Sequence, residues 1–419
     1  MDVLAIKGGN KLCGDIAICA AKNAVLPIVA CSLLCHGEIK LHNCSPLGDV
    51  CDMLDVVAAY GVKSKWEDSD LIIDAREVHD SEADCAVSGR IRSSIFILGS
   101  LIGRLGSACV NYPGGCDIGL RPIDLHIYGL GKLGVKIEEA DGKIICDGSG
   151  LTNGEIVFDF PSVGATENSI MAAVTAIGRT VIRNAAREPE IVDLARFINA
   201  CGGKVSGAGG DVIVIDGVRR LSGCEFTPVA DRIIGGTFLA ACAIAGGDIL
   251  IRNLDTSLIS GVIEKFSTAG VKINRSGSGI RVASFGRLKA VPKIETQPYS
   301  GFPTDMQAQT VAALSTASGT SVMVENLFEN RFGYTKELAK MGARISVKDR
   351  IAVIRGVKKL CGTGVEAKDL RGGAALVVAA LGAEGASVVS GVSHIDRGYY
   401  KIERDLSRLG ADVKRVDCV

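Results

Sequence analysis

A short glycine-containing segment that joins a helix to a strand recurs six times along this chain of 419 residues. Successive copies are spaced by roughly 70 residues, which is longer than the period of about 20–50 residues expected of solenoid repeats. The copies are AYGVKSKW (59–66), KLGVKIEE (132–139), ACGGKVSG (200–207), TAGVKINR (268–275), KMGARISV (340–347) and RLGADVKR (408–415), with anchor glycines Gly61, Gly134, Gly203, Gly270, Gly342 and Gly410. Each copy therefore belongs to a small folded α/β block.

Each block is predicted to open with a helix of small apolar residues. These helices are predicted over 21–34, 92–105, 164–177, 231–244, 304–317 and 369–382. Apolar residues cover most of their circumference, so we expect them to be buried on more than one side. The second helices, such as those over 190–200 and 400–409, are amphipathic and should be more exposed.

The sixth block lacks its last strand, because the chain stops shortly after VKRV (413–416). The segment VLAIKG (3–8) at the other end has the form of the missing strand. We therefore expect the N-terminal strand to complete the last block. This arrangement predicts two three-block domains, one over 22–229 and one formed by 1–21 plus 230–419, with a ligand cleft between them.

Composition excludes several classes of function. The formal net charge is zero, so a general nucleic-acid or membrane-surface role has no electrostatic support. The first residues show no secretory signal, and no apolar run is long enough to span a bilayer. The 15 cysteines are scattered and form no paired CxxC spacing, which indicates reduced thiols in a cytoplasmic protein without a zinc site.

Charged side chains recur at equivalent places in several blocks. The predicted helix starts carry Lys22, Arg92, Arg232, Asp305, Asp369 and Arg371, and the loops before second helices carry Cys116, Arg121, Glu188, Glu190, Arg331 and Arg397. Helix N-termini add free N–H groups and a positive dipole. Taken one at a time, each charge is better explained by solvation or local pairing. Their repetition predicts a site for a multiply charged anion.

Two residues in this set are candidates for proton transfer. Cys116 lies in the glycine-flanked segment PGGCDIG (113–119), and neighbouring cations such as Arg121 would favour its thiolate. An inert cysteine in a glycine turn is an equally good interpretation of that segment alone. Asp305 follows Pro303 at a helix start, where an aspartate is commonly only a dipole partner or cap.

Several longer motifs carry a resemblance that covers essentially the whole chain. They are AAKNAVLP (20–27), RSSI (92–95), PGGCDIGLRPIDLH (113–126), SVGAT (162–166), NAAREPEIVD (184–193), FPTDMQAQ (302–309), FENRF (328–332), DLR (369–371) and HIDRGY (394–399). With these motifs the chain resembles the UDP-N-acetylglucosamine 1-carboxyvinyltransferases, which belong to the enolpyruvyl transferase family. The resemblance implies a mixed α+β fold of two inside-out α/β barrels, each built from three pseudo-symmetric repeats.

The resemblance also implies a reaction between phosphoenolpyruvate and UDP-N-acetylglucosamine that opens peptidoglycan precursor synthesis. The sugar 3-hydroxyl attacks C2 of phosphoenolpyruvate, a tetrahedral ketal forms, and phosphate is lost. Cys116 is implied as the general acid at C3 and the target of the epoxide antibiotic fosfomycin, and Asp305 as the base at the hydroxyl. Lys22 and Arg397 complete the catalytic set. No metal or organic cofactor is implied.

The implied substrate-binding residues form a longer set. Lys22, Arg121 and Arg397 hold the phosphate and carboxylate of phosphoenolpyruvate, with Asn23 beside Lys22. The positions that match UDP-sugar contacts are Arg92, Arg121, Pro122, Ile123, Asp124, Leu125, Asp305 and Leu327, to which we add Arg331 and Arg371 as further substrate-binding residues.

The chain departs from the family pattern at three places, namely Cys19 with Ala20, Phe160 with Pro161, and Ile234. None of these departures removes a catalytic group. Two other functions remain open at this point. One is enolpyruvyl transfer to shikimate 3-phosphate, although the PGGC segment is unexpected there. The other is a non-catalytic protein that binds a UDP-sugar, although such a sensor has no need of Cys116 and Asp305.

Overall fold

The computed structural model describes residues 2–79, 92–112, 119 and 122–417. Cys116 and Arg121, for which the sequence predicts roles in the site, therefore lie outside the described residues. The chain folds into two compact units. We name them the terminal unit, formed by residues up to Cys19 and from Ala230 onward, and the inserted unit, formed by most of the described residues between Ala20 and Val229.

The inserted unit contains three sheets with strand orders β13-β3-β5-β4, β6-β8-β7 and β11-β12-β10-β9. Its strands are β3 (Glu38–Leu41), β4 (Lys63–Glu67), β5 (Asp70–Asp74), β6 (Ser107–Asn111), β7 (Lys136–Ala140), β8 (Lys143–Asp147), β9 (Glu155–Val157), β10 (Arg179–Arg183), β11 (Val205–Ser206), β12 (Val212–Asp216) and β13 (Glu225–Phe226). Its helices are α1 (Lys22–Ser32), α2 (Gly48–Ala58), η1 (Arg92–Phe96), α3 (Ile97–Leu105), α4 (Asp124–Lys132), α5 (Val163–Ala173) and α6 (Pro189–Ala200).

The terminal unit contains three four-stranded sheets, β22-β24-β1-β25, β15-β16-β14-β2 and β17-β18-β20-β19, and the small pair β21-β23. Its strands are β1 (Asp2–Lys7), β2 (Leu12–Ala17), β14 (Gly247–Arg252), β15 (Lys272–Ser276), β16 (Gly279–Ser284), β17 (Lys293–Glu295), β18 (Thr320–Val324), β19 (Arg344–Lys348), β20 (Ile351–Arg355), β21 (Leu360–Cys361), β22 (Gly364–Glu366), β23 (Ala383–Glu384), β24 (Ala386–Ser390) and β25 (Asp412–Asp417). Its helices are α7 (Arg232–Ala245), η2 (Thr256–Ile259), α8 (Ser260–Thr268), η3 (Thr304–Met306), α9 (Gln307–Leu314), α10 (Thr335–Lys340), α11 (Leu370–Leu381), α12 (Val392–Asp396) and α13 (Ile402–Arg408).

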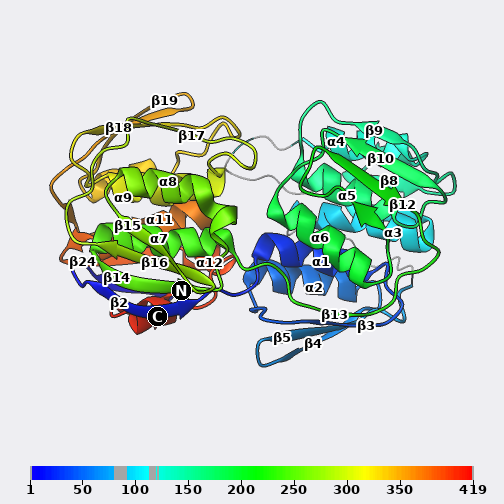
Figure 1. Cartoon of the computed structure of the whole chain (residues 1–419), viewed down its shortest axis with the longest axis horizontal. Coiled ribbons are helices and arrows are strands. Elements are labelled where there is room, and N and C mark those ends of the chain that lie inside the picture. The colour runs from blue at the N-terminus through cyan, green and yellow to red at the C-terminus, as the bar shows by residue number, and fades with distance from the viewer. Residues whose placement is uncertain (1, 80–91, 113–118, 120–121, 418–419) are drawn as a thin grey trace. The chain divides into compact units, whose positions relative to one another are not determined.

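The first helices of the blocks form the core of each unit. In the terminal unit α7, α9 and α11 pack against one another, and the sheets lie outside them (Figure 1). Nearly every residue of α11 is buried, as the all-round apolar pattern predicts. The predicted mixed α/β fold, with helices inside and strands outside, is confirmed.

The N-terminal strand completes the last block, as predicted. In β1, Leu4 lies opposite Arg415 of β25 on one side and Val389 of β24 on the other, in antiparallel register. The apolar side chains of Leu4 and Ile6 are both buried, and their strand contacts α11 and α12. Residues from the two ends of the chain thus share one sheet.

Five of the six anchor glycines have the left-handed backbone conformation that ends a helix. In the third block, the prediction of Gly203 is wrong. There the positive φ belongs to Gly202, at +94°, because the helix ends at Ala200 and its C-cap is Cys201. The pair of adjacent glycines made the choice ambiguous in the sequence.

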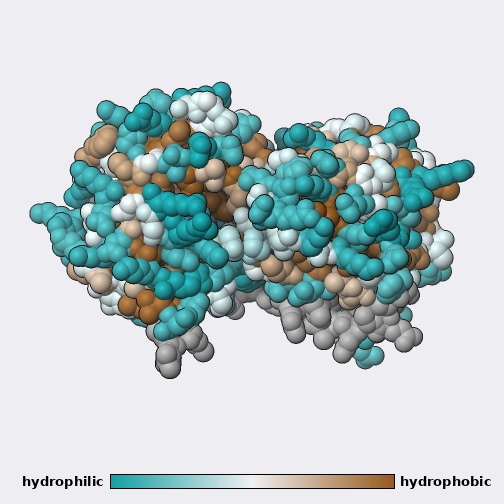
Figure 2. Space-filling model, turned by 90° about the horizontal axis from the view of Figure 1, so that it is seen from below, coloured by the Kyte–Doolittle hydropathy of each residue, from teal (hydrophilic) through white to brown (hydrophobic). Residues whose placement is uncertain are grey.

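Polar residues cover most of the face of each unit seen in Figure 2, and apolar residues form only small patches on it. Large exposed apolar side chains such as Ile177 and Phe285 occur singly. Within the described ranges, no helix combines the length and apolar character needed to cross a bilayer.

Candidate functional site

Asp305 lies between two buried arginines in the terminal unit. It occupies the short helix η3, just before α9 begins at Gln307. One carboxylate oxygen is 2.7 Å from Nη2 of Arg331, and the other is 2.7 Å from Nη2 of Arg371. The arginine side chains are 5% and 4% exposed, whereas that of Asp305 is 26% exposed. The two cations therefore lie behind the carboxylate and orient it, while part of it reaches solvent.

Arg371 is fixed by a network on its inner side. Its Nη1 donates to the hydroxyl of Tyr399 at 3.3 Å. That hydroxyl is 2.8 Å from the hydroxyl of Thr237, and Nε2 of Gln309 donates to it at 3.3 Å. Burial alone would lower the pKa of Arg371, but the charge of Asp305 and its neighbours raises that pKa overall. Arg371 is therefore a permanent buried cation.

The loop that carries Arg331 also carries Leu327. The guanidinium of Arg331 lies over the ring of Phe328, with Cζ 5.6 Å from the ring centre. Leu327 is half-buried at the start of this loop. Four predicted residues, Asp305, Leu327, Arg331 and Arg371, thus come from neighbouring segments of one unit. Arg397 is exposed at the end of α12 in the same unit.

In the inserted unit, Lys22 begins α1 and its Nζ lies 2.8 Å from a carboxylate oxygen of Asp49. Both side chains are nearly buried, at 11% and 7% exposure. Asn23 follows Lys22 and is half-buried. Sequence reasoning missed Asp49, although its place in the first turn of α2 could have marked it as a partner for a lysine at a helix start.

Arg92 and the segment 122–125 lie at the ends of elements tied together by a buried asparagine. Asn168 on α5 donates from Nδ2 to the carbonyl of Ile95 in η1, at 2.9 Å, and lies 3.1 Å from Nδ1 of His126 in α4. His126 is buried as well. The elements that begin with Arg92 and Asp124 are therefore held against the same helix.

Side chains in the segment 122–125 have different surroundings. Ile123 is buried, Leu125 is half-buried, and Pro122 and Asp124 are exposed. Phe160, one of the three departures from the family pattern, is 48% exposed, whereas Ile234 is 7% exposed. Phe160 is thus available for contact with a ligand.

A buried group of carboxyls in the inserted unit was not predicted as part of the site. Glu167 on α5 is 1% exposed, and neither of its carboxyl oxygens has a hydrogen-bond partner within the part of the chain that the structure describes. Burial, together with the charges of Glu190 and Glu188, raises its pKa well above the usual range. Of these three carboxyls, only Glu188 and Glu190 were singled out from the sequence, among the charges in the loops before second helices.

Asp193 on α6 should make stability depend on pH. Burial raises its pKa from 3.8 to about 6, although the backbone N–H of Val229 donates to it at 2.8 Å. Because the folded pKa is the higher one, the stabilising effect of the protonated form is complete below pH 3.8 and is lost as the pH rises to about 6. That difference corresponds to about 3 kcal/mol.

We therefore expect Asp193→Asn to flatten this dependence. Urea unfolding between pH 4 and pH 7 should show the wild-type free energy of unfolding falling more steeply than that of the variant. The exposed pair Asp216 and Arg179 supplies a control, since Asp216→Asn should leave the slope across this range in place. Equal slopes in the wild type and Asp193→Asn would contradict the expectation.

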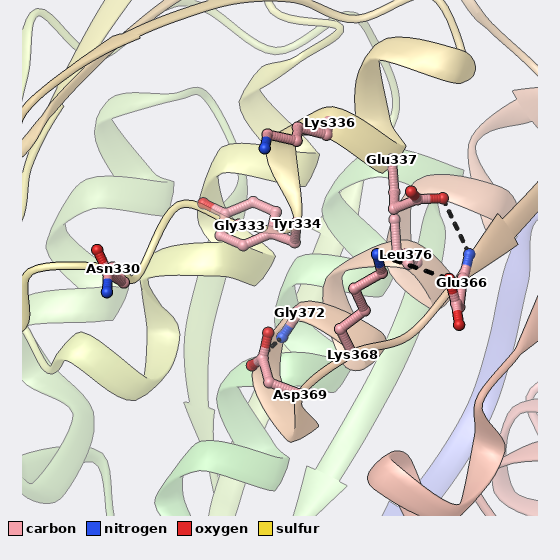
Figure 3. A pocket seen from close by; sticks show the side chains of 10 residues that line it. All are labelled: Asn330, Gly333, Tyr334, Lys336, Glu337, Glu366, Lys368, Asp369, Gly372 and Leu376. Carbon is pink, nitrogen blue, oxygen red and sulfur yellow. Dashed lines mark hydrogen bonds and ion pairs between the residues drawn. The ribbon is translucent and has the colours of Figure 1, made fainter. Parts of the chain in front are cut away.

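The terminal unit also contains a cavity of about 220 Å³ (Figure 3). Its charged lining comprises Lys336, Glu337, Glu366, Lys368 and Asp369. Glu337 accepts from the backbone N–H of Glu366, and Asp369 accepts from that of Gly372. Carboxylates outnumber cations in this lining, and among the charges singled out from the sequence it includes Asp369.

Comparisons with known proteins agree with the motifs. The family model described as EPSP synthase (3-phosphoshikimate 1-carboxyvinyltransferase) matches residues 6–406. UDP-N-acetylglucosamine 1-carboxyvinyltransferase 2 of Caldanaerobacter subterraneus subsp. tengcongensis is 48% identical over 416 residues, which cover 99% of this chain and 100% of that protein. The protein of the same name from Carboxydothermus hydrogenoformans is 44% identical over 418 residues, with 99% and 100% covered.

Solved structures show the same fold. The enolpyruvyl transferase NikO from Streptomyces tendae has a TM-score of 0.88 and 24% identity, with 100% of this chain and 99% of that chain covered. An EPSP synthase from Acinetobacter baumannii has a TM-score of 0.74 and 16% identity, with both chains fully covered. From the family model and the relatives above 40% identity, we conclude that this chain belongs to the enolpyruvyl transferase family, among the UDP-N-acetylglucosamine 1-carboxyvinyltransferases.

Proposed function

We propose that this protein transfers the enolpyruvyl group of phosphoenolpyruvate to the 3-hydroxyl of UDP-N-acetylglucosamine and releases phosphate. This reaction is the first committed step of peptidoglycan synthesis. The observation that carries the proposal is near-full-length identity of 44–48% to relatives with that name. The geometry of Asp305 supports it, because a partly exposed carboxylate held by two buried arginines can receive a proton from a bound hydroxyl.

In the proposed first step, Asp305 accepts the proton of the 3-hydroxyl as its oxygen forms a bond to C2 of phosphoenolpyruvate. Cys116 protonates C3, which gives the tetrahedral ketal. In the second step the ketal loses phosphate and a proton from C3, which restores the double bond. Arg331 and Arg371 orient the Asp305 carboxylate, because each donates a hydrogen bond to one of its oxygens.

The anionic substrate requires fixed cations. Lys22, Arg121 and Arg397 are proposed to hold the phosphate and carboxylate of phosphoenolpyruvate, with Asn23 beside them. Buried Lys22 is kept in place by Asp49. We propose that the remaining predicted residues hold the UDP-sugar. They are Arg92, Pro122, Ile123, Asp124, Leu125 and Leu327.

We place the reaction in the cytoplasm, where thiols stay reduced. Several cysteines in the inserted unit are close together as free thiols. The Sγ atom of Cys201 lies 3.3 Å from that of Cys224 and 3.8 Å from that of Cys35.

Product analysis tests the proposal. Incubation with phosphoenolpyruvate and UDP-N-acetylglucosamine should yield a UDP-sugar whose proton NMR spectrum shows two vinylic protons and a substituted 3-oxygen. A product formed from shikimate 3-phosphate instead would favour the related transfer reaction. Binding of the UDP-sugar without any product would favour a non-catalytic sensor.

Cys116 gives a separate prediction. We expect fosfomycin to inactivate the wild type, because the thiolate opens the epoxide, a C–S bond forms and the ring oxygen takes a proton. Cys116→Asp should retain turnover, since a carboxylic acid can also protonate C3, and should resist the drug. Inactivation is measured as residual turnover after preincubation with the drug and UDP-sugar. Full wild-type activity after that treatment would contradict the role of the thiol.

A further inference from the structure

A fully buried glutamate lies beside the Asp305 cluster and was not predicted from the sequence. Glu325 follows β18 and is 0% exposed. Its Oε1 accepts from the hydroxyl of Thr296 at 2.9 Å and from the backbone N–H groups of Leu327 and Phe328 at 2.9 and 3.3 Å. Its Oε2 accepts from the hydroxyl of Thr304 at 2.9 Å. Four donors thus share one carboxylate, and none of these donors is a cation.

The donors come from three segments that meet at Glu325. Thr296 follows β17 directly, and Thr304 begins η3 immediately before Asp305. Leu327 and Phe328 begin the loop that leads to Arg331. The carboxylate therefore joins the turn that carries Asp305 to the loop that carries its partner Arg331.

Burial of a carboxylate at position 325 costs free energy, which raises the question of what the carboxylate contributes that an apolar side chain would not. A buried carboxylate loses its hydration, and hydrogen bonds to the charged group offset that loss. An apolar residue at this position, directly after Val324, would need no compensation for a buried charge. What the carboxylate adds is direction, because its four bonds fix the positions of both segments relative to each other.

We propose that Glu325 is a positioning residue for Asp305, and that it acts through the hydroxyl of Thr304. Glu325 fixes the position and orientation of Asp305. In that orientation Arg331 and Arg371 bind the Asp305 carboxylate and leave one face of it open to the sugar hydroxyl. Displacement of a catalytic group by about 1 Å can reduce turnover by about 100-fold. This inference rests on the proposed function of the site.

The test begins with Thr304, because this variant removes only the bond to the turn of Asp305. Thr304→Val should lower kcat by about tenfold or more and change the KM for UDP-N-acetylglucosamine less. Thr304→Ser retains the hydroxyl and should restore kcat to within about twofold. Thr310→Val is the matched control. Thr310 lies in the adjacent helix α9 and is 1% exposed, and among the described residues its hydroxyl has no hydrogen-bond partner.

A second arm separates positioning from general structural damage. In an Asp305→Asn background, the base that Thr304 positions is already lost, so Thr304→Val should cause no further loss of the residual turnover. Glu325→Gln should likewise lower kcat in the wild-type background and cause no further loss in the Asp305→Asn background. This comparison requires a melting temperature that shows the variant to be folded. Thr304→Val remains decisive if Glu325→Gln does not fold.

The possible failures are distinguishable. If the wild type shows no turnover with the UDP-sugar, the proposed function fails and this inference fails with it. If the wild type is active but Thr304→Val costs the same factor with and without Asp305, or if Thr310→Val loses as much kcat as Thr304→Val, the inference alone is overturned.

Discussion

Replacement of Asp305 by asparagine is expected to lower kcat by about 100- to 10,000-fold, the range typical of a lost general base. Asparagine retains the size of aspartate and one oxygen that can accept from Arg331 or Arg371, but it cannot take a proton from the sugar hydroxyl. The UDP-sugar should still bind. Steady-state kinetics give kcat, and titration calorimetry gives the affinity for the sugar nucleotide.

Asp349→Asn is the control for this change. Asp349 is exposed in the turn between β19 and β20 and has a φ of +51°, which asparagine tolerates. Its kcat should equal that of the wild type. A kcat of Asp305→Asn within a few-fold of the wild type would remove Asp305 from proton transfer and leave it only as a partner of the arginines.

Replacement of Arg371 by methionine is expected to lower the free energy of unfolding by about 3 kcal/mol, because removal of one member of a buried ion pair leaves its partner uncompensated. Asp305 would lose its ion pair with Arg371, and the hydroxyl of Tyr399 would lose a donor. Turnover should fall as well, because Asp305 loses its orientation. Urea unfolding measures the first effect and steady-state kinetics the second.

The same substitution on an exposed ion pair supplies the comparison. Arg281 pairs with Asp248 on the strands β16 and β14, and the Arg281 side chain is 64% exposed. Arg281→Met should cost less than about 1 kcal/mol, since exposed ion pairs contribute little. Equal losses in the two variants would mean that burial adds nothing to the interaction at Arg371.

The sequence predicted the fold through patterns that are local and repeated. Anchor glycines such as Gly61 and Gly342 mark the ends of helices, and the all-round apolar helices mark the inner layer. The pairing of β1 with β25 joins the two ends of the chain. It could still be predicted, because the last block lacks a strand and the start of the chain has a segment of the same form. Only a local ambiguity, that of Gly202 and Gly203, gave a wrong position.

The site was less accessible from the sequence, because its supporting contacts join distant segments. Asp305, Arg331 and Arg371 were chosen for their places in the blocks, and the structure brings them together. No local pattern pairs Lys22 with Asp49, 27 residues away, or Asp305 with Arg371, 66 residues away. Two buried carboxyls were missed: Glu167 lies within the apolar helix α5, and Glu325 directly follows the strand β18. A single charged residue at such a place forms no repeating pattern that a sequence analysis could detect.

Release of phosphate from phosphoenolpyruvate is the most direct test of enolpyruvyl transfer to a UDP-sugar. It should be measured with UDP-N-acetylglucosamine, with shikimate 3-phosphate, and with neither acceptor. We predict release only with UDP-N-acetylglucosamine, and its near-loss in Asp305→Asn. Release with shikimate 3-phosphate alone, or no release with either acceptor despite binding of the UDP-sugar, would contradict the proposed function.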